Sequence, residues 1–205
     1  MSTCKEWAIA LNQLLQNLSA KPLSREDLLD ALAQFCVDDL DAAFARIWLI
    51  DDTKTTLVLK TSRGQYTRLD GSRSRIAVGQ GSKIDKIYVQ AAPHITNDVL
   101  NDPGVKDKEW AKSEGMVAFA GYPLVWCGET LGVLGMYSRV HLSEDLLIIL
   151  GLFATMAAAV IFQLKQTERN LAQFCDVTGF KPALLDRLIR LGHSPRSNEP
   201  HTIAV

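Results

Sequence analysis

The chain has 205 residues, which is long enough for one domain of about 150 residues with helical extensions. Hydrophobic residues make up 47% of the chain and charged residues 22%, as in an ordinary folded protein. The net charge of −1 gives no overall field that would attract nucleic acid or an anionic membrane.

The cysteines are far apart in the sequence. None belongs to a C-x-x-C pair, and no group of cysteines and histidines has the spacing of a zinc site. The N-terminus has no basic head followed by an apolar core, so it does not resemble a signal peptide. We therefore expect a cytoplasmic protein with free thiols. The four cysteines are Cys4, Cys36, Cys127 and Cys175.

The hydrophobic period changes along the chain from helical to alternating and back to helical. Ser24 with Asp27 resembles the start of a helix, and Pro22 ends the helix before it. The order of elements predicts an α+β fold with an antiparallel sheet and helices on one face. The expected elements are helices over 6–18 and 24–40, strands over 42–50, 55–64 and 75–79, a helix over 82–90, a strand near 93–96, a short helix over 105–113, strands over 116–126 and 129–137, helices over 143–174 and 183–191, and a disordered tail over 193–205.

Cys127 lies between two apolar runs, and its neighbour Gly128 favours a tight turn. Glycine takes a positive φ without steric cost, so the pair suits a two-residue hairpin link. No histidine or aspartate is near Cys127 in the sequence to activate its thiol. We expect Cys127 at the corner of a hairpin, not in an active site.

Residues 146–164 are uncharged and close to the length that spans a bilayer. Gly151, Thr155 and Ala159 form a ladder of small residues at four-residue spacing, which would suit helix packing in a membrane. Aromatic and basic anchors at its ends are few. We expect instead a helix buried against the sheet and a second copy of itself, with no membrane as partner.

Three passages along the chain have a recognisable order. Residues 75–98 combine a glycine-bearing strand, a helix and a short strand that ends at Asn97 and Asp98. Residues 101–124 form an excursion that leads into a strand with a Pro-Leu end, and residues 128–137 form a further strand with two glycines. In this order and spacing the three passages resemble the GAF domain, a family that mostly transmits signals, with residues 116–126 and 128–137 resembling its fifth and sixth strands.

The resemblance implies a GAF/PAS-like, six-stranded antiparallel sheet with a pocket on one face. The helix over 83–90 and a lid over 101–115 would close this pocket. In such domains the first and last helices commonly form a dimer bundle, here through Glu6–Leu18 and Glu144–Gln173. The domains expected are an N-terminal helix in 1–23, a sensory domain in 24–164, and a helical extension with a tail in 165–205.

Members of the family bind cyclic nucleotides, bilins, haem or small metabolites. This chain lacks the signature of the cyclic-nucleotide type, and the helix over 82–90 has no cysteine, so no covalent bilin is expected. The methionine-sulfoxide-reducing type has several cysteines around the pocket, whereas only Cys127 falls in that half of the domain.

Arg46 lies within an apolar strand and needs an anion, either Asp98 or the carboxylate or phosphate of a ligand. Trp110 lies in the expected lid, where its indole ring needs a surface or a ligand to cover. For the other aromatic and methionine candidates, packing in the core is an equal alternative to lining the pocket. The candidate ligand-binding residues are Arg46, Trp48, Tyr88, Asn97, Asp98, Trp110, Met116, Ala118 and Met136.

Haem is the specific cofactor considered, with His94, His141 or Cys127 as axial ligands. The alternative is that both histidines lie on the surface or cap an element. The ligand and the cofactor are otherwise not identified by the sequence.

The expected function is a homodimeric sensory module in signal transduction, such as a two-component system, that binds an unidentified small molecule and acts on a downstream signalling protein. No nucleophile with an adjacent base is present in the lid or pocket strands, so no enzymatic activity is expected. Residues 171–190 faintly resemble a helix-turn-helix, but Pro182 interrupts it, so nucleic acid is not expected as partner. The alternatives are a haem or redox sensor, a structural dimerisation module without ligand, and a small pocket enzyme of the reductase type.

Overall fold

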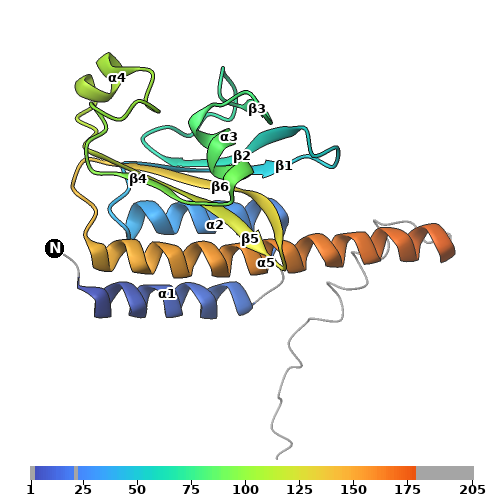
Figure 1. Ribbon diagram of the computed structural model, residues 1–205. Helices are drawn as coiled ribbons and strands as arrows, with labels where there is room; N and C mark the ends of the chain where they lie inside the picture. The colour runs from blue at the N-terminus through green and yellow to red at the C-terminus, as the bar shows by residue number, and fades with distance from the viewer. Residues whose placement is uncertain (1–2, 21–22, 179–205) are drawn as a thin grey trace, which may run out of the picture. The chain divides into compact units, whose positions relative to one another are not determined.

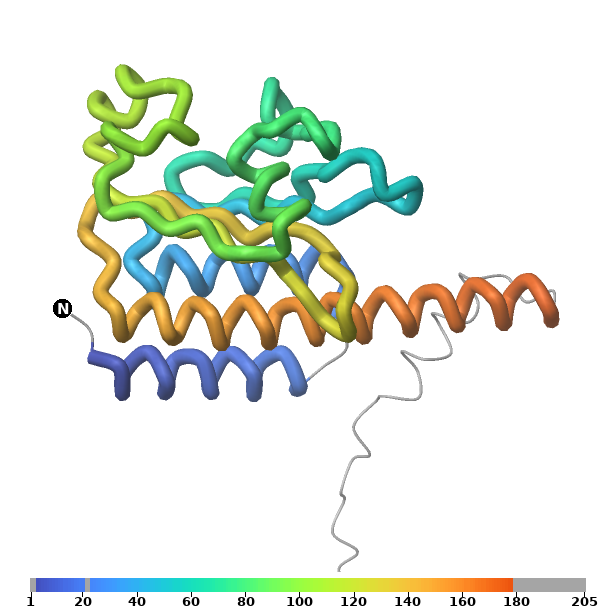
Figure 2. Tube along the Cα trace, viewed as in Figure 1, coloured from blue at the N-terminus to red at the C-terminus, as the bar shows by residue number. Residues whose placement is uncertain are grey.

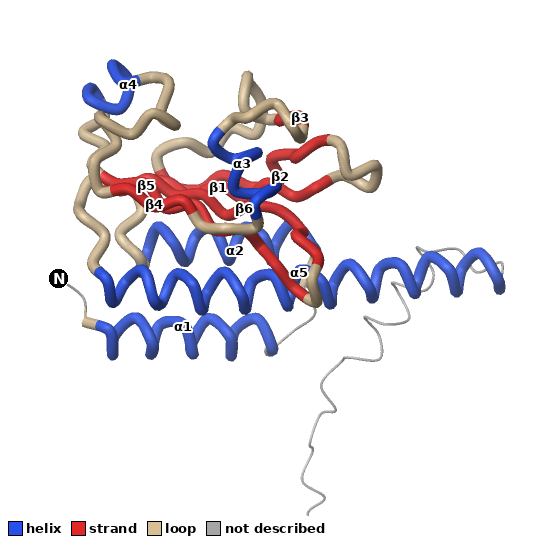
Figure 3. Tube along the Cα trace, viewed as in Figure 1, coloured by secondary structure: helices blue, strands red, loops and turns tan. Residues whose placement is uncertain are grey.

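The computed structural model describes residues 3–20 and 23–178 and contains one six-stranded sheet (Figures 1 and 3). The strand order is β3-β2-β1-β6-β5-β4, and every neighbouring pair is antiparallel. The predicted α+β fold is therefore confirmed. The strands are β1 (Phe44–Ile50), β2 (Thr56–Gly64), β3 (Arg75–Ala77), β4 (His94–Thr96), β5 (Ala118–Trp126) and β6 (Glu129–Ser138).

The two faces of the sheet are covered by different helices. In Figure 1, α2 (Arg25–Asp38) and the first part of α5 (Glu144–Thr178) lie below the sheet, on the same side as α1 (Cys4–Ser19). The short helices α3 (Lys83–Gln90) and α4 (Lys108–Ser113) lie above it. The long helices thus share one face, as predicted, and the short ones occupy the face where the pocket was expected.

Helix starts are fixed by side-chain caps, of which the one at Ser24 was predicted from the sequence. The Thr3 hydroxyl accepts from the Glu6 amide while the Glu6 carboxylate accepts from the Thr3 amide, which is a complete capping box. Ser24 and Ser82 cap α2 and α3 in the same way, through the amide three residues on. The lid helix begins at Lys108 and not at Val105, because Asp107 is its cap.

Alternation along the strands sends neighbouring side chains to opposite faces. Phe44 and Trp48 of β1 face the cluster beneath α3 and α4, together with Val133 of β6. Phe44 pairs with Tyr137 across β1 and β6, and the next pair is Ala45 with Met136. Because successive side chains alternate between faces, Met136 lies on the face that α2 and α5 cover. The position of a residue in this register decides whether it can reach the upper face.

Cys127 and Gly128 form the corner of the β5–β6 hairpin, as predicted. Both have positive φ, 50° and 76°, as a tight two-residue turn between twisted strands requires. The Cys127 thiol is exposed there.

Helix α5 contains an 18-residue window with a mean hydropathy of 2.4, of which 44% is buried. By length and composition alone this helix could cross a membrane. Within the unit formed by residues 1–162, Phe153 of α5 packs on Phe35 of α2 with ring centroids 5.0 Å apart. Such packing is also typical of the core helix of a globular domain.

Residues 163–205 form a second unit, of which the structure describes the last turns of α5, up to Thr178. The predicted helix over 183–191, the tail over 193–205 and most of the helix-turn-helix resemblance over 171–190 lie outside the described residues.

Replacing Gly132 with alanine is expected to destabilise the fold by about 2–4 kcal/mol. An added Cβ would overlap the main-chain carbonyl of Trp48 on the neighbouring strand, so β1 and β6 would have to move apart. Urea unfolding measures the change. The matched control is Gly151→Ala in α5, whose Cβ would be 3.7 Å from the Tyr122 ring and which is expected to be neutral or stabilising by up to about 1 kcal/mol. Equal effects of the two substitutions would contradict this packing.

Candidate functional site

A cavity of about 240 Å³ lies on the face of the sheet opposite α2 and α5. Its floor is formed by β1, β5 and β6, and its sides by α3, α4 and the β2–β3 loop. The lining residues are Phe44, Arg46, Trp48, Tyr66, Arg73, Lys83, Ile84, Val105, Asp107, Trp110, Phe119, Gly135 and Tyr137.

Aromatic rings make up much of the cavity wall. Phe44 and Tyr137, opposite each other on β1 and β6, are stacked with centroids 5.2 Å apart and planes 19° apart. Phe119 of β5 packs on Tyr137 at 4.9 Å. Trp110 of α4 meets Tyr137 edge to face at 5.3 Å. Flat apolar surfaces in these orientations suit a flat ligand.

The cavity roof is closed where the β2–β3 loop meets the lid. The Trp110 indole Nε1 donates a hydrogen bond of 2.9 Å to the Tyr66 hydroxyl. The Tyr66 ring also packs edge to face on Phe44, with centroids 5.1 Å apart. In the trace of Figure 2, both segments lie above the sheet. We call the Tyr66–Trp110 contact the clasp, since it joins two segments 44 residues apart.

Two arginines bring positive charge to the cavity. Arg46 Nε donates to the Ser62 hydroxyl at 3.1 Å, and the guanidinium lies 5.3 Å from the Phe44 ring centroid. Burial lowers the pKa of Arg46, and the positive charge of Arg73 lowers it further. Arg73 is fixed through its carbonyl, which accepts from the Trp48 indole at 2.9 Å. Neither guanidinium forms an ion pair with a carboxylate within residues 3–20 and 23–178.

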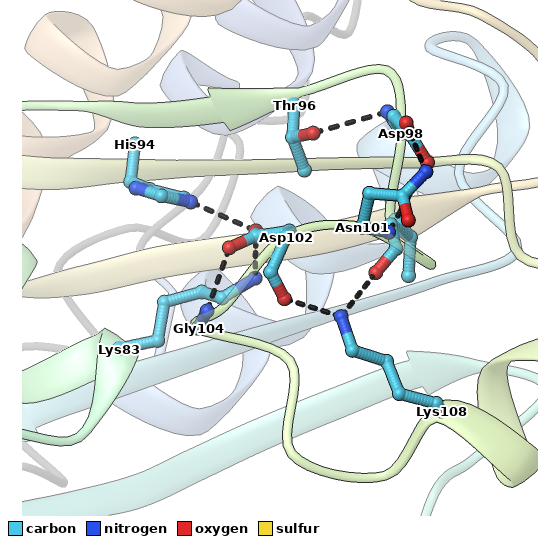
Figure 4. A network of polar contacts seen from close by, with 9 residues as sticks. Lys83, His94, Thr96, Asp98, Asn101, Asp102, Gly104 and Lys108 are labelled. Atoms are coloured by element: carbon cyan, nitrogen blue, oxygen red, sulfur yellow. Dashed lines mark hydrogen bonds and ion pairs between the residues drawn. The ribbon is translucent and has the colours of Figure 1, made fainter.

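Beside the cavity, one buried carboxylate connects α3, β4 and the lid (Figure 4). Asp102 Oδ2 lies 2.7 Å from Lys83 Nζ and 2.9 Å from His94 Nε2, and Asp102 Oδ1 accepts from the Gly104 amide at 2.7 Å. The side chains of Asp102 and Lys83 are only 3% and 6% exposed. We call this group the Asp102 hub. Lys108 adds to it by donating to the carbonyls of Val99 and Asp102.

The hub favours the charged form of Asp102 but not that of Lys83. Burial alone would raise the pKa of Asp102, but hydrogen bonds from Lys83, His94 and the Gly104 amide outweigh burial and lower that pKa to about 2. Burial also lowers the pKa of Lys83, and its attraction to Asp102 only partly offsets this. The carboxylate is therefore well stabilised, whereas the ammonium is held at a cost. Lys83 Nζ also lies 4.0 Å from the Phe119 ring centroid, which places it at the cavity wall.

Comparison with known proteins gives the family. The family model described as GAF domain matches residues 22–161. The chain belongs to the GAF family. No curated protein matches the sequence.

Solved GAF structures share this fold at low sequence identity. The GAF domain of a phosphoenolpyruvate-protein phosphotransferase (ptsP) from Coxiella burnetii is 22% identical, with a TM-score of 0.70 over 82% of this chain and 99% of that chain. Residues 122 to 287 of a methyl-accepting chemotaxis protein are 19% identical, with a TM-score of 0.58 over 77% and 98%. Free methionine-R-sulfoxide reductase from Neisseria meningitidis, in complex with its substrate, is 18% identical, with a TM-score of 0.63 over 82% and 95%. GAF domains are generally sensory or regulatory modules of signalling proteins, and the chemotaxis protein is one such neighbour.

The GAF cavity brings together three of the nine predicted ligand residues, Arg46, Trp48 and Trp110. Tyr88 and Met116 pack in the hydrophobic cluster beside it. The remaining four lie elsewhere for reasons of register and capping.

Ala118 and Met136 do not reach the cavity, because strand alternation turns them toward α2 and α5. The Asn97 side chain bonds to the Leu142 main chain, donating to its carbonyl at 3.0 Å and accepting from its amide at 2.8 Å. Asp98, one of the two alternatives considered as the anion for Arg46, does not pair with it; the Asp98 carboxylate accepts from the amide and side chain of Asn101.

The residues considered as haem ligands do not line the cavity either. His94 is bonded to Asp102, His141 is exposed, and Cys127 is at the hairpin corner. Six further lining residues were not predicted from the sequence: Phe44, Tyr66, Arg73, Lys83, Phe119 and Tyr137. Of these, Tyr137 could have been found, since it lies two residues from Gly135 on a predicted strand.

Tyr66→Phe is expected to loosen the roof of the cavity while leaving the fold intact. The substitution removes the acceptor of the Trp110 indole, so the clasp loses its hydrogen bond, at a cost of about 1 kcal/mol. Amide hydrogen exchange should become faster in 65–74 and 107–115. The control Tyr122→Phe removes a hydroxyl that bonds to the Leu147 carbonyl on the opposite face, and should leave exchange in both segments unchanged. Equal exchange in Tyr66→Phe and the wild type would argue against the clasp.

Asp102→Asn is expected to destabilise the fold by about 3–5 kcal/mol at neutral pH, because Lys83 would stay buried without its counter-charge. Folding lowers the pKa of Asp102 from its ordinary 3.8 to about 2. The ionised carboxylate therefore stabilises the folded wild type by about 2 kcal/mol at any pH above about 4. This contribution should disappear as the pH falls through about 2. Urea unfolding against pH measures both effects.

The pH-dependent part should be missing from Asp102→Asn, and Lys83→Met in addition should restore part of the loss. Asp70→Asn is the control, since Asp70 pairs with Arg68 on the surface. A wild type and an Asp102→Asn variant with parallel pH profiles would contradict the hub.

Proposed function

We propose that this GAF domain is a sensory module that binds a small molecule in the sheet-face cavity and passes the signal through its terminal helices. The observation that carries the proposal is a formed cavity beneath a roof made of two separate loops, joined by the clasp. A ligand that touches both Tyr66 and Trp110 would stabilise the closed arrangement and shift the population toward it.

A route from the lid to α5 supports this proposal. The lid follows Asn97, whose side chain is bonded to Leu142, directly before the Ser143 cap of α5. At the other end of the lid, the Glu114 carbonyl accepts from Arg139 Nε at 3.0 Å. Residues 139–142 are thus bonded to Glu114 at one end of the lid and to Asn97 shortly before its other end, so its closure would act on the start of α5.

We further propose that the output is a change in a homodimer. Two large apolar side chains one turn apart on α5, Ile148 and Leu152, are 61% and 58% exposed. Together with Ile9 on α1 they would be covered if two copies packed through these helices. A downstream signalling protein would then read the helix arrangement, and the protein would act in the cytoplasm without nucleic acid or membrane as partner.

Binding rather than catalysis is proposed for the cavity. Among the described residues that line it, none is a cysteine, serine, threonine or histidine. The Cys127 thiol is exposed at the far hairpin, and Cys36 is buried in α2 with its pKa strongly raised by burial. A cysteine, serine or threonine nucleophile activated by a neighbouring base is therefore not assembled by these residues.

Native mass spectrometry of the full chain purified from cells is the test, together with its visible absorption spectrum. We expect a colourless dimer with a bound small molecule. Adding that molecule to the stripped protein at a hundredfold excess over its Kd should stabilise the fold by about 3 kcal/mol. Trp110→Ala should abolish this gain, because Trp110 lines the cavity.

Trp126→Ala is the matched control, since Trp126 lies partly exposed at the β5–β6 hairpin and should keep the stabilisation. A dimer that stays empty, even after incubation with a total metabolite extract, would favour a structural dimerisation module. A Soret band would show haem and contradict the proposal of a colourless metabolite.

A further inference from the structure

We propose that the ligand of the cavity is a small oxyanion, a carboxylate or phosphate carried on a flat unsaturated or aromatic body. This inference rests on the proposed function and adds the chemical class of the ligand. Two features of the cavity support it independently: its unbalanced positive charge and the arrangement of its rings.

The charge argument begins with the positive side chains that face the cavity, Arg46, Arg73 and Lys83. Lys83 is neutralised by Asp102 in the hub. Asp107 is the one carboxylate among the described lining residues, and its Oδ1 accepts from the Trp110 amide as the cap of α4. Counting Asp107 against the two arginines leaves one net positive charge at the cavity, and neither arginine forms an ion pair with a carboxylate within residues 3–20 and 23–178.

Arg46 is held in a costly position. It lies in the middle strand pair of the sheet, partly buried, with another guanidinium near enough to disfavour its charge. A desolvated cation without a counter-ion is unfavourable, and an oxyanion would supply both charge and acceptors. Within the described part of the chain, the Arg46 guanidinium donates one hydrogen bond, from Nε to the Ser62 hydroxyl. Its other N–H groups have no acceptor there.

The residue opposite Arg46 across β1 and β6 is Gly135, which also lines the cavity. A Cβ at Gly135 would come within 3.3 Å of the Trp48 ring and 3.5 Å of Ile84. The glycine therefore lets Trp48 and Ile84 pack close to the floor, and the cavity that Arg46 and Gly135 both line lies beside the guanidinium. An anion placed there could bind Arg46 in the bidentate geometry that guanidinium groups favour.

The ring arrangement defines the rest of the ligand. Phe44 and Tyr137 form a stacked pair, and Trp110 and Tyr66 approach them from the lid and the loop. Aromatic cages of this kind can also bind cations, but the arginines would repel a cationic ligand here. The cavity volume of about 240 Å³ is below the usual range for drug-sized ligands, which favours a compact molecule.

The test is a binding panel on the full chain at low salt, followed by tryptophan fluorescence. Benzoate, indole-3-acetate and phenyl phosphate are compared with the neutral benzamide and indole-3-acetamide and with the cation benzylamine. We expect the anions to bind at least about tenfold more tightly than the neutral and cationic compounds. A preference for benzoate and indole-3-acetate over phenyl phosphate would identify the head group as carboxylate, and the reverse as phosphate.

Arg46→Gln should weaken binding of the preferred anion by about tenfold to a hundredfold, and Arg46→Lys by less. Arg73→Gln serves as a second variant, because Arg73 is on an exposed loop and its replacement spares the sheet. Arg68→Gln is the control, since Arg68 pairs with Asp70 outside the cavity and its loss should leave binding unchanged.

The oxyanion class would be overturned if benzylamine or the amides bound as tightly as the acids. It would also be overturned if Arg46→Gln and Arg73→Gln both bound the preferred anion as tightly as the wild type. Either result would leave the proposed sensory function standing. If no panel member binds, capture from a total metabolite extract by native mass spectrometry decides. A captured neutral or cationic molecule overturns the class alone, a captured flat anion lost in Arg46→Gln supports it, and an empty cavity overturns this inference and the proposed function together.

Discussion

The buried carboxylate of Asp102 determines how the cavity is enclosed. It accepts hydrogen bonds from Lys83 of α3, His94 of β4 and the Gly104 amide of the lid. Three separate segments are thereby fixed to one carboxylate. Its desolvation is balanced by these donors, which is why its pKa falls to about 2 despite burial. The lid therefore has a buried anchor beside the sheet, whereas its outer part is held by more exposed contacts, the indole hydrogen bond of the clasp and the hydrogen bonds of Glu114 with Gln65 and Arg139.

This division between a firm anchor and a weak closure suits a sensor. The Asp102 hub keeps Lys83 at the cavity wall, and the lid ends are bonded to the segment that leads into α5. A ligand would need only a few kcal/mol of preference for the closed arrangement to change its population. Arg46 explains where this preference could arise, because its partly buried charge, which has no ion pair among the described residues, is less costly when an anion is present than when the cavity is empty.

The sequence predicted the fold well and the cavity only in part. The cap at Ser24, strand alternation and the turn at Cys127 are local signals, and each of these predictions was confirmed. The cavity depends on register between distant strands: Met136 and Tyr137 differ by one position but face opposite sides of the sheet. Arg46 was noticed as an arginine in need of an anion, but its hydroxyl partner Ser62 and the approach of the loop that carries Arg73 follow from tertiary contacts. Periodicity in one segment carries no information on these contacts.

A crystal structure of the full chain with the molecule that co-purifies from cells would test the central claim most directly. The account predicts density for a flat body against Phe44 and Tyr137, with oxygen atoms within hydrogen-bonding distance of the Arg46 guanidinium and the clasp closed above it. Density for a ligand elsewhere on the molecule, or an Arg46 side chain turned out of the cavity to pair with a protein carboxylate, would contradict it.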